Sequence, residues 1–223
     1  MSQTPFDPSR RRFLSLPALA AIGGGGLLAG CSLLPIIAKP PKLYTLSPKS
    51  TFPADLPLAQ YQLGVEKPSA PAVLSTAKIA VARGPYQMDY YSGALWVDDA
   101  PNMIQRLLIE SFENSQRIVA VGRDSVGLRS NFVLRCEVRE FQTEYPSVES
   151  EEAPLVHVSI NAKLIGLPKR IIVAVTTETQ RIVAPENKLS TIVETFDVAL
   201  GKVLRQIVVW TLTQPETQAF RPR

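Results

Sequence analysis

Few residues of this 223-residue chain are of a type and spacing that could do chemistry. The chain has one histidine, His157, so a metal site built from several imidazoles is excluded, and a Ser-His-Asp or Cys-His arrangement would have to use this residue. His157 lies where apolar and polar residues alternate, which favours an ordinary strand position over a general base. The acidic group Glu149, Glu151 and Glu152 is typical of a solvated loop, because paired catalytic carboxylates need a defined separation across a pocket. We therefore predict no catalytic residue, no metal site and no cofactor.

The first 30 residues have the parts of an export signal. Arg10 and Arg11 precede the apolar stretch 13–29, which is interrupted by Pro17 and four glycines. Such a stretch is too short and too weakly apolar to cross a membrane, but a basic, an apolar and a small-residue part in this order indicate a secretory signal. The paired arginines resemble the twin-arginine export signal, which a receptor reads. We predict that residues 1–30 are a cleaved signal peptide.

Cys31 ends this signal in the sequence Leu28-Ala29-Gly30-Cys31, which resembles a bacterial lipobox. In a lipobox the cysteine thiol is acylated and the signal is cut before it, so Cys31 is the predicted lipid attachment site. Several acyl chains, at about 0.8 kcal/mol per buried CH₂, anchor a protein to a bilayer without spanning it. By resemblance to lipoproteins of Gram-negative bacteria, Ser32 in the next position implies transfer to the outer membrane, whereas an aspartate there would favour retention in the inner membrane.

Charge gives no support to a nucleic-acid partner. The whole chain carries a formal charge of +4, and removal of residues 1–30, with three arginines and one aspartate, lowers it to +2. No run of five or more Lys or Arg remains. Once Cys31 is acylated, Cys136 has no partner in the chain, so a disulfide framework is also excluded.

The segment 31–60 carries six prolines and is predicted to be the lipidated cysteine and a proline-rich tether. Such segments are extended and semi-rigid. The same residues are equally consistent with a flexible linker whose only role is to span the distance between the anchor and the domain. The remaining chain is predicted to form one domain, 61–213, followed by a polar tail, 214–223.

Periodicity indicates an α/β fold class in which a mixed β-sheet is covered by helices. Alternating segments predict strands, of which 131–145 is the clearest. The cap and proline of Asp98-Asp99-Ala100-Pro101 predict the start of an amphipathic helix over 102–115. Further strands are expected at 43–46, 61–65, 77–81, 118–121, 155–167 and 171–183, a hairpin of 88–91 with 94–97 around Ser92-Gly93, and a second amphipathic helix over 189–208.

Four features in order resemble the ABC-type transport auxiliary lipoproteins, the PqiC-like family. They are the lipobox cysteine, Tyr44-Thr45-Leu46 soon after it, an aromatic segment with Tyr90, Tyr91 and Trp96 before an amphipathic helix, and a last helix ending in Trp210. The resemblance implies a three-layer sandwich resembling the TolB amino-terminal domain. It also implies a lipoprotein on the outer membrane that faces the periplasm, and the family has no known catalytic centre. It further implies as partners an Mce-domain protein and an ABC permease and ATPase that move phospholipid or other hydrophobic compounds.

Several alternatives stay open at this stage. Tyr90, Tyr91, Trp96 and Trp210 are the best candidates for a partner or lipid contact, although aromatic residues near strands more often pack in a core. An activator or assembly lipoprotein of a cell-wall or lipopolysaccharide machine could share this α/β build. An exported hydrolase would have to depend on His157 and scattered Ser, Asp and Glu. The sequence also leaves open whether the domain is a monomer or a homo-oligomer.

Overall fold

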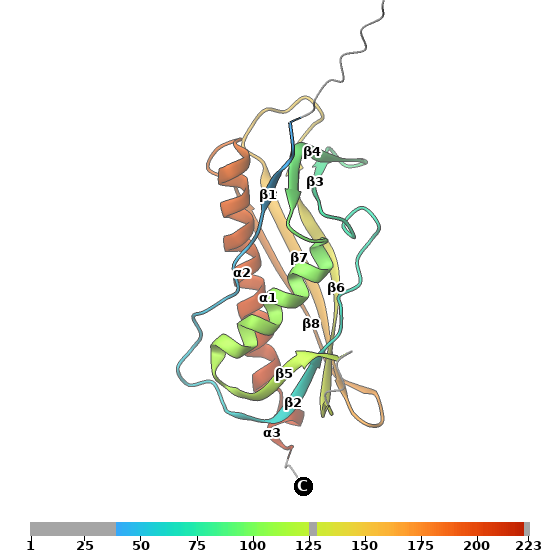
Figure 1. Cartoon of the computed structure of the whole chain (residues 1–223), viewed down its shortest axis with the longest axis vertical. Helices are drawn as coiled ribbons and strands as arrows, with labels where there is room; N and C mark the ends of the chain where they lie inside the picture. Colours follow the sequence, from blue (N-terminus) through green and yellow to red (C-terminus); the bar gives the residue numbers. More distant parts are fainter. Residues whose placement is uncertain (1–38, 125–128, 221–223) are drawn as a thin grey trace, which may run out of the picture. The chain divides into compact units, whose positions relative to one another are not determined.

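Three long antiparallel strands form the centre of the molecule. The computed structural model describes residues 39–124 and 129–220. The three strands are β6 (Phe132–Tyr145), β7 (Leu155–Gly166) and β8 (Ile171–Val183), as Figure 1 shows. Apolar residues alternate along β6 and β7, so one face of this strand pair is buried. The strands predicted at 131–145, 155–167 and 171–183 are confirmed.

Opposite β7, the other edge of β6 has two neighbouring strands, one after the other along its length, and the sheet divides between them. The start of β6, residues 132–134, pairs in parallel with one strand, and its end, residues 142–145, pairs in parallel with another. Each neighbour carries further strands outward, which gives a mixed, curled sheet. The first branch is β2 (Ala59–Val65) with β5 (Ile118–Arg123), and the second is β3 (Lys78–Arg83), β4 (Gln87–Trp96) and β1 (Lys42–Tyr44).

Helix α1 (Ala100–Ser115) begins where the sequence predicted a cap. Asp99 accepts a hydrogen bond from the backbone N–H of Asn102 at 2.8 Å, and Pro101 lies in the first turn. The helix ends at Gln116, whose φ of 53° is left-handed. This N-terminal cap satisfies a backbone donor that has no partner within the helix.

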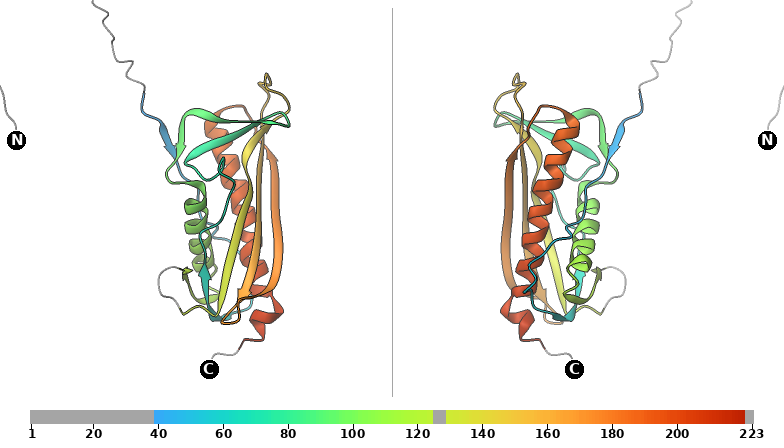
Figure 2. Two further views of the ribbon diagram at one scale, coloured as in Figure 1. Left: turned by 90° about the vertical axis from the view of Figure 1, so that its right-hand side faces the viewer. Right: turned by 90° about the vertical axis from the view of Figure 1, so that its left-hand side faces the viewer.

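Helix α2 (Leu189–Thr213) is the longest element and lies against β7, β8 and α1. Figure 2 shows α2 between α1 and the three long strands. A short helix, α3 (Pro215–Gln218), follows it and packs on the domain through the buried Thr217, so the prediction of a polar tail from residue 214 is wrong for this segment. Within the described residues, no helix combines the length and hydropathy needed to cross a membrane. The predicted fold class, a mixed β-sheet covered by helices, is confirmed.

Aromatic rings fill the core at two places. Trp96, Phe141 and Phe196 meet with ring centroids 5.1 to 5.6 Å apart, which joins β4, β6 and α2. Tyr61 and Phe132 meet at 5.0 Å, and Phe220 lies beside them. Such pairs stabilise a core beyond the area that they bury.

The hairpin predicted around Ser92-Gly93 is wrong. β4 is one strand from Gln87 to Trp96, and its partner β3 pairs with it on both sides of Gly93. The register jumps between these two parts, and Gly93 has a φ of 67°, which fits an irregularity within a strand. The true turn lies between β3 and β4, where Gly84 has a φ of 70°.

Residues 39–60, which the sequence assigned to the tether, pack on the folded unit. β1 pairs with β4, Leu46 and Leu56 are buried, and the backbone N–H of Lys49 donates to Ser111 Oγ at 2.9 Å. Proline indicates an extended backbone, but it carries no information on whether that backbone is packed. The folded unit therefore begins at Lys39, and only the residues before it are left for a tether.

Candidate functional site

The predicted attachment and export residues lie outside the described part of the chain. Cys31, Arg10 and Arg11 all precede Lys39, the first described residue. Their roles as lipid attachment site and export signal therefore stay predictions. The separation along the chain limits how far a lipid anchor at Cys31 could be from the domain, because Cys31 comes only eight positions before Lys39, where the folded unit begins.

The two tryptophans differ in position. Trp96 is 1% exposed and packs between Phe141 and Phe196, so its prediction as a partner contact is wrong. The reason is the irregularity in β4, which leaves Trp96 facing the helices. Trp210 is half-buried near the end of α2 and packs on the core, so part of its surface is accessible.

Tyr90 and Tyr91 are both half-buried in β4. The hydroxyl of Tyr90 donates to the carbonyl of Val73 at 3.3 Å. Tyr91 Oη shares hydrogen bonds with Tyr145 Oη at 3.0 Å and Thr143 Oγ1 at 3.2 Å, and burial raises the pKa of Tyr91 above its usual value. The contacts of Tyr91 hold β4 against β6, and the contact of Tyr90 holds β4 against the loop that carries Val73, so both tyrosines position the strand and expose little surface for a partner.

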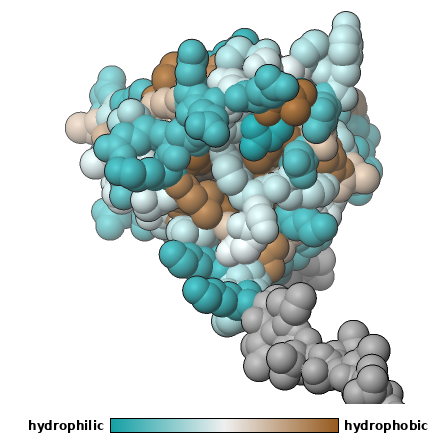
Figure 3. Space-filling model, turned by 90° about the horizontal axis from the view of Figure 1, so that it is seen from above, coloured by the Kyte–Doolittle hydropathy of each residue, from teal (hydrophilic) through white to brown (hydrophobic). Residues whose placement is uncertain are grey.

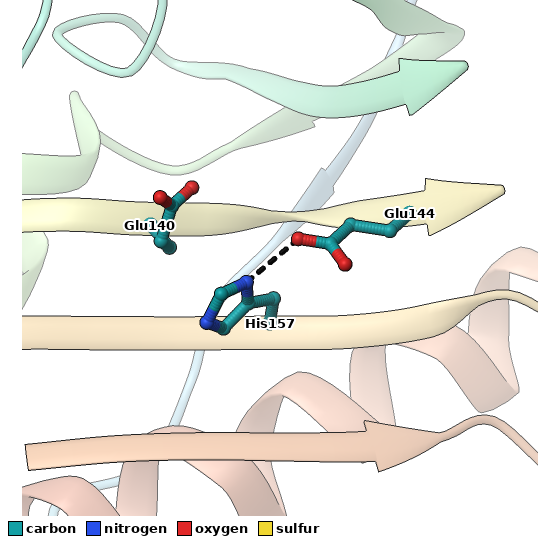
Figure 4. A group of neighbouring side chains, drawn as sticks. All are labelled: Glu140, Glu144 and His157. Atoms are coloured by element: carbon teal, nitrogen blue, oxygen red, sulfur yellow. Dashed lines mark hydrogen bonds and ion pairs between the residues drawn. The ribbon is translucent and has the colours of Figure 1, made fainter. Parts of the chain in front are cut away.

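Among the described residues, a close group of titratable side chains lies on the face of β6 and β7 that points away from the helices. Figure 4 shows Glu140 and Glu144 on β6 and His157 on β7. His157 Nδ1 lies 2.6 Å from Glu144 Oε1, and Arg181 donates to the other carboxylate oxygen of Glu144 at 2.8 Å. The carboxylate of Glu144 on β6 thus has one partner on the neighbouring strand β7 and one on β8, the strand beyond it.

This group, Glu140, Glu144 and His157, offers one imidazole nitrogen and two carboxylate oxygens within 4.8 Å, a set that could hold a divalent metal ion. However, the guanidinium of Arg181 already compensates the charge of Glu144. In the described part of the chain, the hydrogen-bond partner of His157 is a carboxylate and not a hydroxyl or thiol. The arrangement is therefore an ion-pair network, and it assembles no nucleophile with its base.

Sequence reasoning placed His157 on a strand but missed its partner. In the antiparallel register His157 lies opposite Gln142, so the diagonal neighbours on the same face are Glu140 and Glu144. The bulge between Val138 and Glu140 shifts this register. Alternation alone predicts the face of a residue but not its neighbour across the sheet.

A second ion pair on the same face joins β6 to the end of β2. Arg135 donates from Nε and Nη2 to the two carboxylate oxygens of Glu66, at 2.5 and 2.9 Å, and Arg170 approaches at 3.5 Å. The hydrogen bond from Arg135 lowers the pKa of Glu66 below its ordinary value. The neighbouring Cys136 points to the core, where burial raises the pKa of its thiol to about 12, so it is protonated and inert at neutral pH.

The edge of the sheet at β8 is open. Among the described strands β8 pairs with β7 alone, so its outer row of backbone groups has no strand partner. Large apolar side chains of β8 are more than half exposed, namely Ile171, Ile172, Val175 and Val183. An exposed edge of this length is a ready template for another chain.

Solved structures place the fold in a known class. The chain is similar to protein XCC0632 from Xanthomonas campestris, with a TM-score of 0.73 and 29% identity over 80% of this chain and 98% of that one. A second solved, uncharacterised protein has a TM-score of 0.59 at 15% identity, covering 78% of this chain and 99% of that one, which shows the fold alone. The class is a mixed, curled sheet with helices.

The chain belongs to the ABC-type transport auxiliary lipoprotein component family, whose model matches residues 44–208. It is also 24% identical over 198 residues to the uncharacterised protein bll6063 of Bradyrhizobium diazoefficiens, covering 84% of this chain and 50% of that one. The chain thus spans about half the length of this curated relative. The matched residues include all the strands from β2 to β8, the whole of α1, and α2 as far as Val208.

Proposed function

We propose that this protein is a non-enzymatic lipoprotein of the outer membrane, facing the periplasm, that serves an Mce-type ABC transporter for phospholipid or other hydrophobic compounds. The observation that carries the proposal is the family match over residues 44–208 in a chain whose Cys31 stands in a lipobox. The lipid anchor fixes one end of the transport assembly, and the folded domain docks a partner protein there. The inert Cys136 and the paired His157 support a role without catalysis.

The docking surface that best supports this role is the open edge of β8. Its backbone groups can extend the sheet into a partner, and the exposed apolar side chains of Ile171, Ile172 and Val175 can be covered in the same contact. The adjacent face of β6 and β7 carries paired charges, which suits the polar rim of such an interface.

The anchor is tested by Cys31→Ala in the full-length chain. The variant should leave the membrane fraction and appear soluble in the periplasm, because no acyl chain remains to hold it. Cys136→Ala is the matched control, since this cysteine is buried in the core and should not affect fractionation. A Cys31→Ala protein that still fractionates with membranes would refute the anchor.

The outer-membrane location is tested at the next residue. Ser32→Asp should move the protein from the outer-membrane to the inner-membrane fraction, and Ser32→Ala should leave it where it is. If the wild-type protein already separates with inner membranes, the location is wrong while the anchor stands.

The partner is tested by site-directed cross-linking from β8 in cells. A photo-reactive residue in place of Val175 should capture an Mce-domain protein, and one in place of the exposed Val119 of β5 should not. Deletion of the gene should sensitise cells to detergents. Capture of a penicillin-binding protein instead, with unchanged detergent resistance, would favour the cell-wall activator.

A further inference from the structure

The turn between β3 and β4 carries an aromatic side chain that the fold does not use. Tyr86 is 97% exposed, and Met88 after it is 43% exposed. Both belong to the segment Gly84–Met88, here called the hairpin tip. A turn that presents an unpacked aromatic ring is typical of a surface contact, because solvation alone gives no reason to place the ring there.

The first described strand begins at the same end of the folded unit as this tip. β1 pairs in parallel with β4, with Lys42 opposite Ala94, so the two strands run in the same direction. In Figure 1 the first residues of β1 and the start of β4 lie at the same end of the folded unit. The described chain therefore enters the folded unit at the end that carries the hairpin tip.

The length of chain between Cys31 and β1 limits how far the bilayer can be from the hairpin tip. Cys31 comes eleven positions before Lys42, so the chain can place the acyl chains at most about 40 Å from the level of Ala94. Gln87 comes seven positions before Ala94 in β4, which places the hairpin tip at most about 24 Å from that level. A bilayer held by Cys31 is thus within reach of the hairpin tip.

The surroundings of the hairpin tip resemble a membrane-interface surface. Arg83 donates to the carbonyl of Val148 at 3.2 Å and stacks over Tyr145, which supports the tip from the neighbouring loop. Val148 and Val183, at the ends of β6–β7 and β8, are also more than half exposed. Figure 3 looks onto this end and shows hydrophobic areas separated by hydrophilic ones. Aromatic and aliphatic groups between charges suit the headgroup region more than the hydrocarbon interior.

We propose that the hairpin tip inserts Tyr86 and Met88 into the headgroup region of the bilayer that anchors Cys31. The inference rests on the proposed acylation of Cys31 and adds a second, protein-made contact with the same phospholipid surface. Insertion is shallow, because Glu149, Glu151 and Glu152 of the neighbouring loop stay in water. Two contacts instead of one fix the orientation of the domain, so that the open edge of β8 faces the periplasm at a constant angle.

The test uses the full-length, acylated protein in vesicles of phosphatidylethanolamine and phosphatidylglycerol. An environment-sensitive fluorophore is attached through Tyr86→Cys, and through Lys169→Cys in the turn at the far end of β7 as the matched control. Cys136 is 1% exposed and takes no label. Brominated acyl chains should quench the fluorophore at position 86 several-fold more than the one at 169, with a blue shift at 86 only.

The outcomes separate the inference from the function that it rests on. If the protein is on the vesicles and both positions are quenched equally, the tip does not insert and the inference is overturned, while the anchor stands. If Cys31 itself takes the label and the protein stays off the vesicles, the acylation and the inference both fail. Thermal unfolding of both labelled variants checks the fold, and it should be unchanged because both positions are exposed.

Discussion

The two faces of the β6–β7 strand pair differ in what they contribute. The inner face, toward the helices, is a continuous apolar surface that includes Leu134, Phe141 and Ile160, each at most 2% exposed. The outer face carries ion pairs and a histidine, with Arg135 about half exposed. The same strands thus provide stability on one face and most of the titratable chemistry on the other. Substitutions on the outer face should therefore alter contacts and charge without unfolding the domain.

The largest effect is expected from Phe141→Ala on the inner face. The ring is 2% exposed and meets Trp96 and Phe196, so its removal leaves a cavity and costs about 3–5 kcal/mol of the free energy of unfolding. Chemical denaturation of the purified protein measures it. Phe141→Leu, which keeps most of the volume, should cost clearly less. A loss below about 1 kcal/mol for the alanine variant would mean that the inner face is not the source of stability.

A smaller effect is expected from Tyr91→Phe, which removes one hydroxyl at the boundary of the core. Tyr145 keeps a hydrogen bond of 2.7 Å to Asn187, but Thr143 loses its partner on Tyr91. We expect a loss of about 1 kcal/mol, the net value of a hydrogen bond between neutral groups. Tyr86→Phe, at an exposed position, is the matched control and should be neutral in solution. Equal effects of the two variants would contradict the structural role of Tyr91.

Glu66→Gln tests the outer face by charge. Arg135 holds the carboxylate of Glu66 with two hydrogen bonds, but Arg135 is half exposed, so we expect a loss of only about 1 kcal/mol at neutral pH. Because the folded-state pKa of Glu66 is lowered, its contribution is present above the ordinary value of 4.5 and is lost as the pH falls through the folded-state pKa.

The measurement is the free energy of unfolding of wild type and Glu66→Gln between neutral and acid pH. The two curves should coincide at low pH, separate as the pH rises from the folded-state pKa of Glu66 to 4.5, and keep a constant separation above pH 4.5. Glu137→Gln is the control, because the pair of Glu137 with Arg139 is longer, at 3.3 Å, and about half exposed on both sides. A constant difference at all pH values would show that the glutamine acts through packing.

Features of the fold that have a local signal could be predicted from the sequence, and features set by tertiary packing could not. Alternation placed β6, β7 and β8 correctly and assigned His157 to a strand, because a half-buried strand follows a simple period. The cap at Asp99 was also predicted, since its signal is local. The neighbours of His157 and the burial of Trp96 depend on register and on irregularities at Val138 and Gly93, which are set by tertiary packing.

The start of the domain was predicted too late in the chain for a similar reason. Six prolines indicated an extended chain over 31–60, and the backbone of 39–60 is indeed largely without helix. Whether such a chain packs depends on single apolar residues, here Leu46 and Leu56, that find a place beside the helices. Composition averages over these residues, so it placed the start of the domain too late.

The smallest effect is expected from His157→Ala on the outer face, and it decides whether this face carries chemistry. The imidazole is bonded to Glu144, but Arg181 holds the other oxygen of that carboxylate at 2.8 Å, so its loss leaves the charge compensated. We expect a change below about 0.5 kcal/mol in the free energy of unfolding and full detergent resistance of cells that carry the variant. Arg181→Ala, measured in the same way, removes the compensating charge and should have the larger effect of the two.

If His157→Ala abolished resistance with an unchanged melting temperature, the group of Glu140, Glu144 and His157 would have to act on a ligand, and the hydrolase alternative would return with His157 as its base.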